Sequence, residues 1–99
     1  MKIRALSNMP YASAKVHEYR KQDDDIQNMD ILVSYKTPVV SIDYDTHLVV
    51  CYGLYTRTTI RHISSLMREK GMNYYIAKAC YIHDWMYDFI EKKFLSRPV

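Results

Sequence analysis

The sequence predicts an α+β domain in which a three-stranded antiparallel sheet is packed by two C-terminal helices. Three observations support this prediction. Short runs of β-branched and aromatic residues fall between residues 31 and 52, and such residues favour the pleated surface of a sheet. The connections between these runs are only a few residues long, which suits antiparallel neighbours. From residue 57 onward apolar residues recur at intervals of three and four, the spacing of an amphipathic helix.

Turn-forming residues separate the three predicted strands, which cover residues 31–35, 39–42 and 48–52. Thr37-Pro38 lies between the first two, and a proline there marks an edge or a turn because it cannot donate to a sheet ladder. The aspartate-rich stretch 43–47 is typical of a turn between the second and third strands. The sequence therefore predicts two consecutive hairpins.

Alternation along the first strand predicts which of its side chains face the core. Successive side chains of a strand point to opposite faces of the sheet. We expect an inner face formed by Ile31, Val33 and Tyr35. The outward residues are then Leu32, Ser34 and Lys36.

Two helices are predicted after the strands. Thr56 or Thr58 can cap the first helix, and Gly71 ends it. Asn73 can cap the second, whose apolar residues continue to Phe94. This second helix is apolar over more than half of its girth, so it needs cover from the sheet and also from the first helix, the N-terminal arm or a second copy of the chain. A homodimer is therefore one predicted arrangement.

Residues 1–29 are predicted to form an arm that precedes a single domain at residues 30–99. Within the arm, apolar residues repeat at i, i+3, i+7 and i+10, which is compatible with a short helix. These residues are Met9, Ala12, Val16 and Tyr19. An irregular arm fits them nearly as well. The run Asp23-Asp24-Asp25 is interpreted as a solvated linker.

The composition fits one folded domain and excludes several other classes. The chain has 99 residues, of which 48% are hydrophobic and 25% charged, and this argues against disorder and low-complexity repeats. No apolar stretch reaches the roughly 18 residues that a membrane span needs, and residues 1–10 lack the apolar core of a secretory signal. These features predict a cytoplasmic protein. The net charge of +3 disfavours an acidic mimic of DNA and falls short of the excess usual in nucleic-acid-binding domains.

The sequence holds no motif that indicates catalysis, a metal or a cofactor. The chain has only two glycines, so phosphate-cradling loops and a GxSxG elbow are excluded. Its four histidines are not spaced as zinc ligands usually are. Cys51 and Cys80 lie inside apolar runs and are interpreted as buried thiols in a reducing compartment. We therefore expect no enzymatic activity, no bound metal and no cofactor.

Three arginines are predicted to form a stripe along the first helix. Arg57, Arg61 and Arg68 fall within about 40° of one another at the rotation of an α-helix. Guanidinium groups can pair with carboxylates on an acidic protein, or grip phosphates together with the hydroxyls of Thr56 and Thr58. A solvated helix face is the plain alternative. The modest net charge favours a protein partner over nucleic acid.

Tyrosines are unusually frequent near this stripe. The chain has ten of them, and tyrosine offers a large contact area with a polar tip, which favours interfaces. Tyr44, Tyr52 and Tyr55 lie just before the stripe in the sequence and extend it into a predicted Tyr and Arg surface. The alternative is that these rings complete a small core.

Two segments resemble a known group of proteins. Residues 34–40 read Ser-Tyr-Lys-Thr-Pro-Val-Val, and residues 55–63 read Tyr-Thr-Arg-Thr-Thr-Ile-Arg-His-Ile. They resemble an SYxTPV strand and a TTxxHI helix start shared by short, largely uncharacterised proteins of bacteriophages and mobile elements of Gram-positive bacteria. The resemblance covers roughly residues 31–67. It implies a viral or plasmid accessory protein in a bacterial cytoplasm, and many such proteins bind host or defence machinery.

These observations predict a small non-enzymatic protein that blocks or modulates a host or defence macromolecule, in the manner of anti-CRISPR inhibitors. The predicted contact residues are Tyr44, Tyr52, Tyr55, Thr56, Arg57, Thr58, Arg61 and Arg68. A host or defence protein is the first expected partner. The alternative is a nucleic-acid-binding regulator that uses the arginine stripe.

Overall fold

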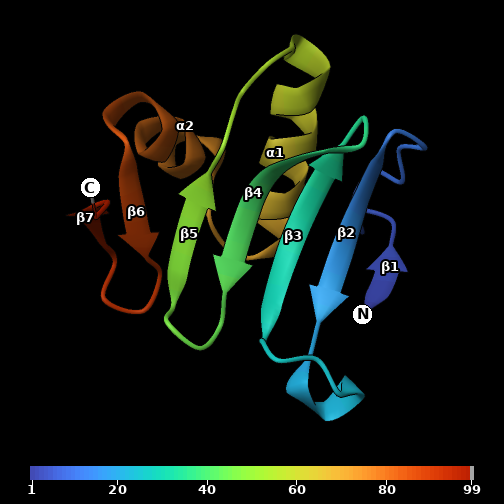
Figure 1. Cartoon of the computed structure of the whole chain (residues 1–99). Coiled ribbons are helices and arrows are strands. Elements are labelled where there is room, and N and C mark those ends of the chain that lie inside the picture. The colour runs from blue at the N-terminus through green and yellow to red at the C-terminus, as the bar shows by residue number, and fades with distance from the viewer. Residues whose placement is uncertain (99) are drawn as a thin grey trace.

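The computed structural model describes residues 1–98 and shows one antiparallel sheet with two helices on one of its faces (Figure 1). Within the described residues the sheet has seven strands, and the α+β class is confirmed. The strands are β1 (Lys2–Arg4), β2 (Ala14–Tyr19), β3 (Met29–Ser34), β4 (Thr37–Asp43), β5 (Leu48–Cys51), β6 (Trp85–Asp88) and β7 (Lys93–Ser96). The helices are α1 (Arg57–Glu69) and α2 (Tyr74–His83), and a 3-10 turn, η1 (Lys21–Asp23), lies between β2 and β3.

The predicted three-stranded sheet is wrong, because four further strands extend it on both sides. The strands follow one another across the sheet in chain order, each antiparallel to its neighbour. The three predicted strands correspond to β3, β4 and β5 at its centre. The two helices are inserted between β5 and β6, and the chain then returns to the same sheet.

The N-terminal segment contributes strands where a short helix was one prediction. Ala14 and Val16 are fully buried, and Lys15 between them is exposed, which is the period of a strand. Val16 pairs with Leu32 of β3, so β2 lies directly beside the centre of the sheet. The helical spacing read from Met9 to Tyr19 competed with this alternation, and pairing with β3 decides between them.

The second helix is shorter than predicted and ends at His83. Asp84 follows it in the left-handed conformation (φ 56°), which aspartate tolerates better than most residues. Its carboxylate accepts a hydrogen bond from Arg97 at 2.9 Å. Residues 85–96 then form the β6–β7 hairpin rather than a helix through Phe94. The prediction of one long helix that is apolar over more than half of its girth is therefore wrong, while a homodimer stays a prediction.

The predicted helix caps are confirmed where the helices begin. Thr56 Oγ1 accepts the backbone N–H of Thr59 at 3.2 Å, and Asn73 Oδ1 accepts that of Tyr75 at 3.0 Å. Gly71 ends α1 as predicted, with a φ of 73° that suits glycine.

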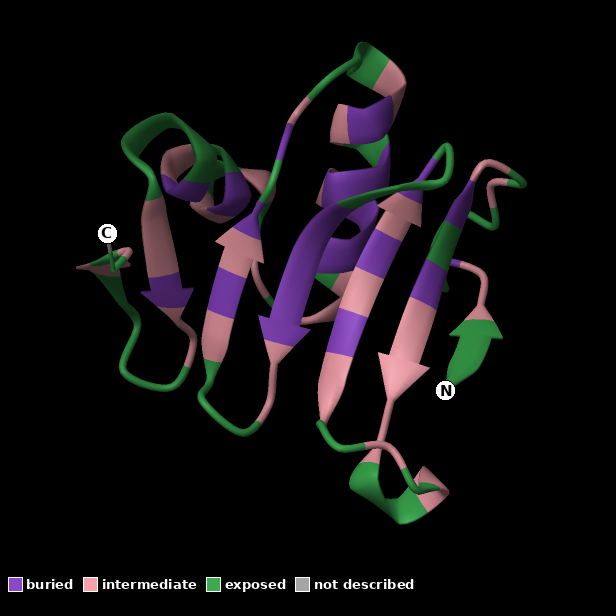
Figure 2. Cartoon of the chain, in the orientation of Figure 1, coloured by how far each residue is buried: buried purple, intermediate pink, exposed green. Residues whose placement is uncertain are grey.

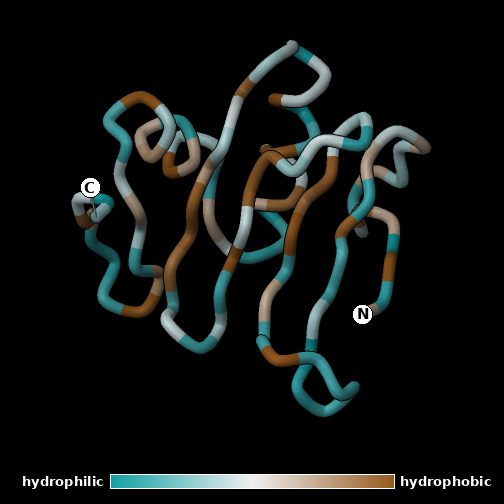
Figure 3. Tube along the Cα trace, in the orientation of Figure 1, coloured by the Kyte–Doolittle hydropathy of each residue, from teal (hydrophilic) through white to brown (hydrophobic). Residues whose placement is uncertain are grey.

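The core lies between the helices and one face of the sheet, as the buried residues in Figure 2 show. A row of residues in register across four strands packs toward the helices. This row consists of Val16, Leu32, Val40 and Cys51. The predicted inner face of β3 is wrong, because Leu32 and Ser34 are buried while Ile31 and Val33 alternate onto the other face. The buried face of this strand carries the polar residues Asp30 and Ser34 beside Leu32, so the rule that apolar residues face inward selected the wrong face. Figure 3 shows the strand as a largely hydrophobic stretch.

Both cysteines are buried and free, as the sequence predicts. Burial raises the pKa of the Cys80 thiol to about 11 and also raises that of Cys51. Both thiols are therefore protonated at neutral pH.

Among residues 1–98, no helix is long and apolar enough to cross a membrane.

Candidate binding surfaces

Helix α1 presents three arginines on its outer side. Arg57, Arg61 and Arg68 are exposed, whereas Ile63 and Met67 on the inner side are fully buried. Within residues 1–98 none of the three guanidinium groups takes part in an ion pair. Arg61 lies about one turn from Arg57, and Arg68 lies about 16 Å from Arg57 along the axis. The stripe is an open row of cations.

Tyr55 stands beside the start of this row. Its backbone is left-handed (φ 41°), which is strained for tyrosine, and it is 65% exposed. The ring lies over Gly53, where an added Cβ would come within 2.4 Å of the tyrosine Cζ. Glycine at position 53 therefore leaves the space that the ring occupies. We call the surface formed by Tyr55, Thr56, Arg57, Thr58, Arg61 and Arg68 the cationic helix surface.

The layer of helices concentrates positive charge. Residues 57–83 contain five lysines and arginines and a single acid, Glu69, in a chain with a net charge of +3. The Glu69 carboxylate is engaged, because it accepts hydrogen bonds from the Arg4 guanidinium and from the backbone N–H of Ser7. Lys70 is paired with Asp30. The remaining cations of the layer therefore face outward with no ion pair in the described part of the chain.

The acidic residues gather elsewhere, at one end of the sheet. Seven of the eleven lie in or beside the β2–β3, β4–β5 and β6–β7 connections, which share the lower end of the sheet in Figure 1. These are Asp23, Asp24, Asp25, Asp43, Asp45, Asp88 and Glu91. The same connections also carry, in or beside them, Arg20, Lys21, Lys92 and Lys93, so this end is acidic in balance only by a few charges, whereas the layer of helices is cationic.

Tyr44 does not join the cationic helix surface but belongs to a buried polar cluster near the acidic end. Its hydroxyl donates to Asp30 Oδ2 at 2.7 Å, and Asp30 is fully buried. Arg20 pairs with Asp30 Oδ1 at 2.8 Å and Lys70 with Oδ2 at 2.9 Å. Burial raises the pKa of the Asp30 carboxyl, but the hydrogen bonds from Tyr44, Lys70 and Arg20 outweigh it and hold this pKa below its usual value. Tyr44 therefore has a structural role, because its hydroxyl satisfies the buried Asp30 carboxylate.

Tyr52 lies over the face of the sheet that carries no helix. Its hydroxyl hydrogen-bonds Ser41 Oγ at 2.9 Å. Ser41 alternates with the core residues Val40 and Ile42 along β4, so its side chain points away from the helices. Of the predicted contact residues, the structure thus brings together those from Tyr55 to Arg61, with Arg68 farther along α1, and separates Tyr44 and Tyr52 from them.

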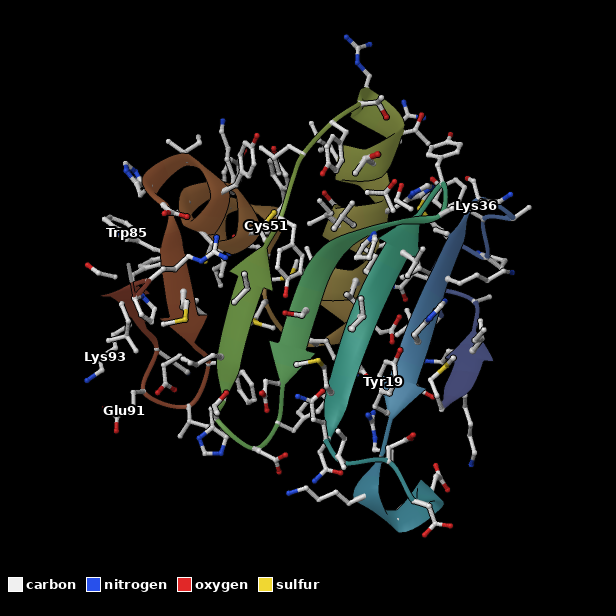
Figure 4. The ribbon with its side chains drawn as sticks, viewed as in Figure 1. Tyr19, Lys36, Cys51, Trp85, Glu91 and Lys93 are labelled. Atoms are coloured by element: carbon white, nitrogen blue, oxygen red, sulfur yellow. The ribbon has the colours of Figure 1, made fainter. Side chains whose placement is uncertain are left out.

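A groove of about 490 Å³ opens beside the β3–β4 hairpin. We call it the hairpin groove; it is lined by Ala12, Ser13, Lys15, His17, Val33, Tyr35 and Lys36. Lys15 and His17 alternate with the buried residues of β2, so they reach the groove from the helix-free face. Lys36 lies at the upper end of the sheet in Figure 4.

A buried histidine lies behind the hairpin groove. His62 of α1 is fully buried, and its Nδ1 hydrogen-bonds Ser34 Oγ at 2.9 Å while Nε2 lies 3.5 Å from Ser13 Oγ. Thr59 Oγ1 completes the cluster at 3.1 Å from the Ser34 hydroxyl. Burial lowers the pKa of the His62 imidazole, which makes it a weaker base. Ser13 therefore links this buried cluster to the lining of the groove.

Sequence reasoning missed the two buried clusters and the groove. Asp30, Ser34 and His62 are polar residues that are buried because partners from distant segments satisfy them, and those segments carry no local signal. The β3–β4 turn carries no local signal either, because Tyr35 and Lys36 are not the residues that two-residue turns favour. The structure places the turn at these residues, and Thr37-Pro38 begins β4 instead. Among residues 1–98, no group of three or more His, Cys, Asp or Glu is arranged to hold a metal ion.

The fold and these surfaces define a small α+β protein with helices on one face of an antiparallel sheet and cations on the outer side of those helices. The chain belongs to a family of unknown function, DUF8033, whose model matches residues 2–82. This range includes β1 to β5, all of α1 and nearly all of α2. No curated protein and no solved structure is significantly similar to the chain.

Proposed function

We propose that the chain is a non-enzymatic binding protein that uses the cationic helix surface to occupy an acidic surface on another protein. The observation that carries this proposal is the open row formed by Arg57, Arg61 and Arg68, which have no ion pair within residues 1–98. A guanidinium pairs with a carboxylate in a bidentate geometry, so such a row suits an acidic partner. The expected mechanism is steric occupation of the partner.

Tyr55 adds an aromatic anchor to the row. Tyrosine and arginine are the residue types most often found at the energetic centre of interfaces. The Tyr55 ring lies over Gly53 and is 65% exposed, so it is accessible to a partner beside the start of the row. Tyrosine offers a large contact area with a polar tip, which suits a protein interface.

The biological setting is part of the same proposal. The resemblance of residues 34–40 and 55–63 to phage and mobile-element proteins supports an accessory protein in a bacterial cytoplasm. We expect its partner to be a host or defence protein that it inhibits, as anti-CRISPR proteins do.

The test is a charge reversal that leaves the fold intact. Tagged wild-type protein and the Arg57→Glu/Arg61→Glu variant are used to capture partners from nuclease-treated host lysate. The partner found with the wild type is then purified for direct titration. We expect at least tenfold weaker binding by the variant, which corresponds to about 1.4 kcal/mol.

The matched control reverses two other exposed cations, Lys92→Glu/Lys93→Glu, of which Lys92 ends the β6–β7 turn and Lys93 begins β7 beside the exposed Glu91. This control changes the net charge by the same amount at the acidic end of the molecule. Equal loss in both variants would mean that net charge alone matters, and full binding by the arginine variant would make the row a solvated surface.

The charge of the helical layer supports a second candidate, a nucleic-acid-binding regulator that grips phosphates with the same arginines. Five cations and one engaged acid over residues 57–83 form a local excess that the net charge hides. Nuclease treatment separates the candidates, because a phosphate-binding surface loses its lysate partner on that treatment. Its binding to random duplex also falls steeply as salt rises.

The His62 cluster is the nearest approach to catalytic chemistry, and it supports the non-enzymatic reading. Its imidazole is enclosed and weakened as a base, and its partners are hydroxyls rather than a carboxylate. Ser13→Ala tests this point. We expect wild-type partner binding and inhibition from this variant, whereas loss of inhibition with intact binding would indicate an enzyme.

A further inference from the structure

The turn that borders the hairpin groove is made from residues that fit it poorly. Tyr35 and Lys36 form a two-residue turn in which both φ angles are positive, at 49° and 68°. This conformation favours Asn-Gly, because a side chain with a Cβ is strained there. The chain instead places a bulky aromatic residue and a lysine at these two positions, and strain of this kind is typical of functional sites.

Both strained residues line the groove, and their side chains are available. Tyr35 is 56% exposed, and its ring centroid lies 5.8 Å from that of the buried His62. The backbone N–H of Tyr35 donates to the carbonyl of Ser13 at 2.8 Å, which joins the turn to the segment before β2 that supplies Ala12 and Ser13 to the lining.

The charges of the groove are cationic and unpaired. Lys36 at the turn and Lys15 on β2 are exposed, and neither takes part in an ion pair within residues 1–98. Ser13 is also a lining residue, and its hydroxyl lies 3.5 Å from the buried His62 Nε2. Val33 and Ala12 supply apolar surface between these polar groups.

We propose that the hairpin groove binds one nucleotide unit, with its base against the Tyr35 ring and its phosphate between Lys15 and Lys36. An exposed aromatic ring in a cationic groove is the combination that binds unpaired nucleotides, since every base has a face that stacks. The groove volume of about 490 Å³ lies within the range of small-ligand sites. This site is distinct from the cationic helix surface, and the inference does not rest on the proposed function.

The nucleotide unit can come from a free nucleotide or from single-stranded nucleic acid, and one set of titrations distinguishes these sources. NMR chemical shifts of the backbone amides of the whole chain are followed as adenosine monophosphate, inorganic phosphate or a short oligothymidylate is added. We expect shifts at groove residues with the first and third probes, and at least tenfold weaker binding of phosphate alone. Tighter binding of the oligonucleotide assigns the source to single-stranded nucleic acid, and equal or tighter binding of the mononucleotide assigns it to a free nucleotide.

A more stable variant that cannot bind gives the decisive comparison. Tyr35→Asn/Lys36→Gly restores the favoured turn while it removes the ring and one ammonium group. We expect a higher melting temperature than that of the wild type, together with loss of nucleotide binding. Unchanged nucleotide binding by this variant would overturn the proposal.

The lysine contribution has a matched control within the chain. Lys36→Gln and Lys92→Gln remove the same charge from two exposed lysines that share a left-handed backbone, with φ angles of 68° and 55°. We expect about tenfold weaker nucleotide binding for Lys36→Gln and no change for Lys92→Gln. Equal losses in the two variants, no binding of any probe, or phosphate bound as tightly as the nucleotide would each overturn the proposal.

Discussion

The charged residues at the two ends of strand β3 differ in whether they are paired within the chain. At one end Asp30 is fully buried, and its carboxylate is matched by Arg20, Lys70 and Tyr44. At the other end the Tyr35-Lys36 turn keeps a strained backbone, and Lys36 has no ion pair in the described residues. Charges that find partners inside the chain stabilise the fold. Charges that stay exposed beside a strained backbone are the ones to test for binding.

Removal of the paired charge is expected to have the largest effect on stability. Asp30→Ala leaves Lys70 without its carboxylate and leaves Arg20 with only that of Glu18, at 3.8 Å. Loss of one partner from a buried ion pair destabilises by about 3 kcal/mol, at the lower end of the usual range, because these side chains are still 26% and 23% exposed to water. Urea unfolding measures the change. Glu91→Ala, which removes an exposed carboxylate, serves as the control. An equally small change in unfolding free energy in both variants would show that Asp30 does not contribute substantially to stability.

The two buried clusters are expected to give stability a pH dependence in two separate windows. Burial lowers the pKa of His62, so the unfolded chain binds protons there more readily. The His62 contribution is complete above the unfolded pKa of about 6.5 and is lost as pH falls through the lower folded pKa. For Asp30, whose folded pKa is also lowered, the loss begins below about pH 3.9.

Urea midpoints between pH 7 and pH 2 test these two windows. We expect His62→Gln to remove the loss of stability that begins below about pH 6.5 and to leave the loss below about pH 3.9 unchanged. Stability that rises as the wild type is taken from pH 7 to pH 5 would contradict the assignment.

A gain in stability is expected at the opposite end of β3. Tyr35→Asn/Lys36→Gly relieves two left-handed residues and should stabilise the chain by about 1–2 kcal/mol. Thermal unfolding measures this change, with Lys92→Gly as a comparison at a single left-handed position. An unchanged or lower melting temperature of the double variant would show that the turn is not strained.

The smallest stability effect with a binding consequence is expected at Gly53. A Cβ there would meet the Tyr55 ring at 2.4 Å, and the exposed ring can move away. We expect Gly53→Ala to change the unfolding free energy by less than about 1 kcal/mol and to weaken partner binding several-fold. Tyr55→Ala provides the reference for complete removal of the ring, and partner binding equal to wild type in both variants would exclude Tyr55 from the interface.

Local sequence signals were enough for the centre of the fold. The β-branched runs of β3 to β5, the Thr56 and Asn73 caps and Gly71 all depend on neighbouring residues. The outer strands were not predicted, because their residues fit both the helical period and the strand period, as in the segment from Met9 to Tyr19. Only pairing with a distant strand selects one of the two. The helix predicted through Phe94 was wrong for the same reason.

The candidate sites divide in the same way. The arginine stripe follows from spacing on one helix and could be predicted. The hairpin groove joins residues from two strands and a loop, and the burial of Asp30 and Ser34 depends on partners far away in the chain. The rule that polar residues face solvent predicts the wrong buried face for β3, because it takes no account of hydrogen-bond partners that are distant in the sequence.

The central claim is that the unpaired arginines of α1 bind a partner and do not hold the fold. The most direct measurement is a pair of values for Arg57→Glu/Arg61→Glu, namely its unfolding free energy and its affinity for the purified partner. We expect the free energy to stay within about 0.5 kcal/mol of wild type while the affinity falls at least tenfold. Wild-type affinity in a folded variant would contradict the claim.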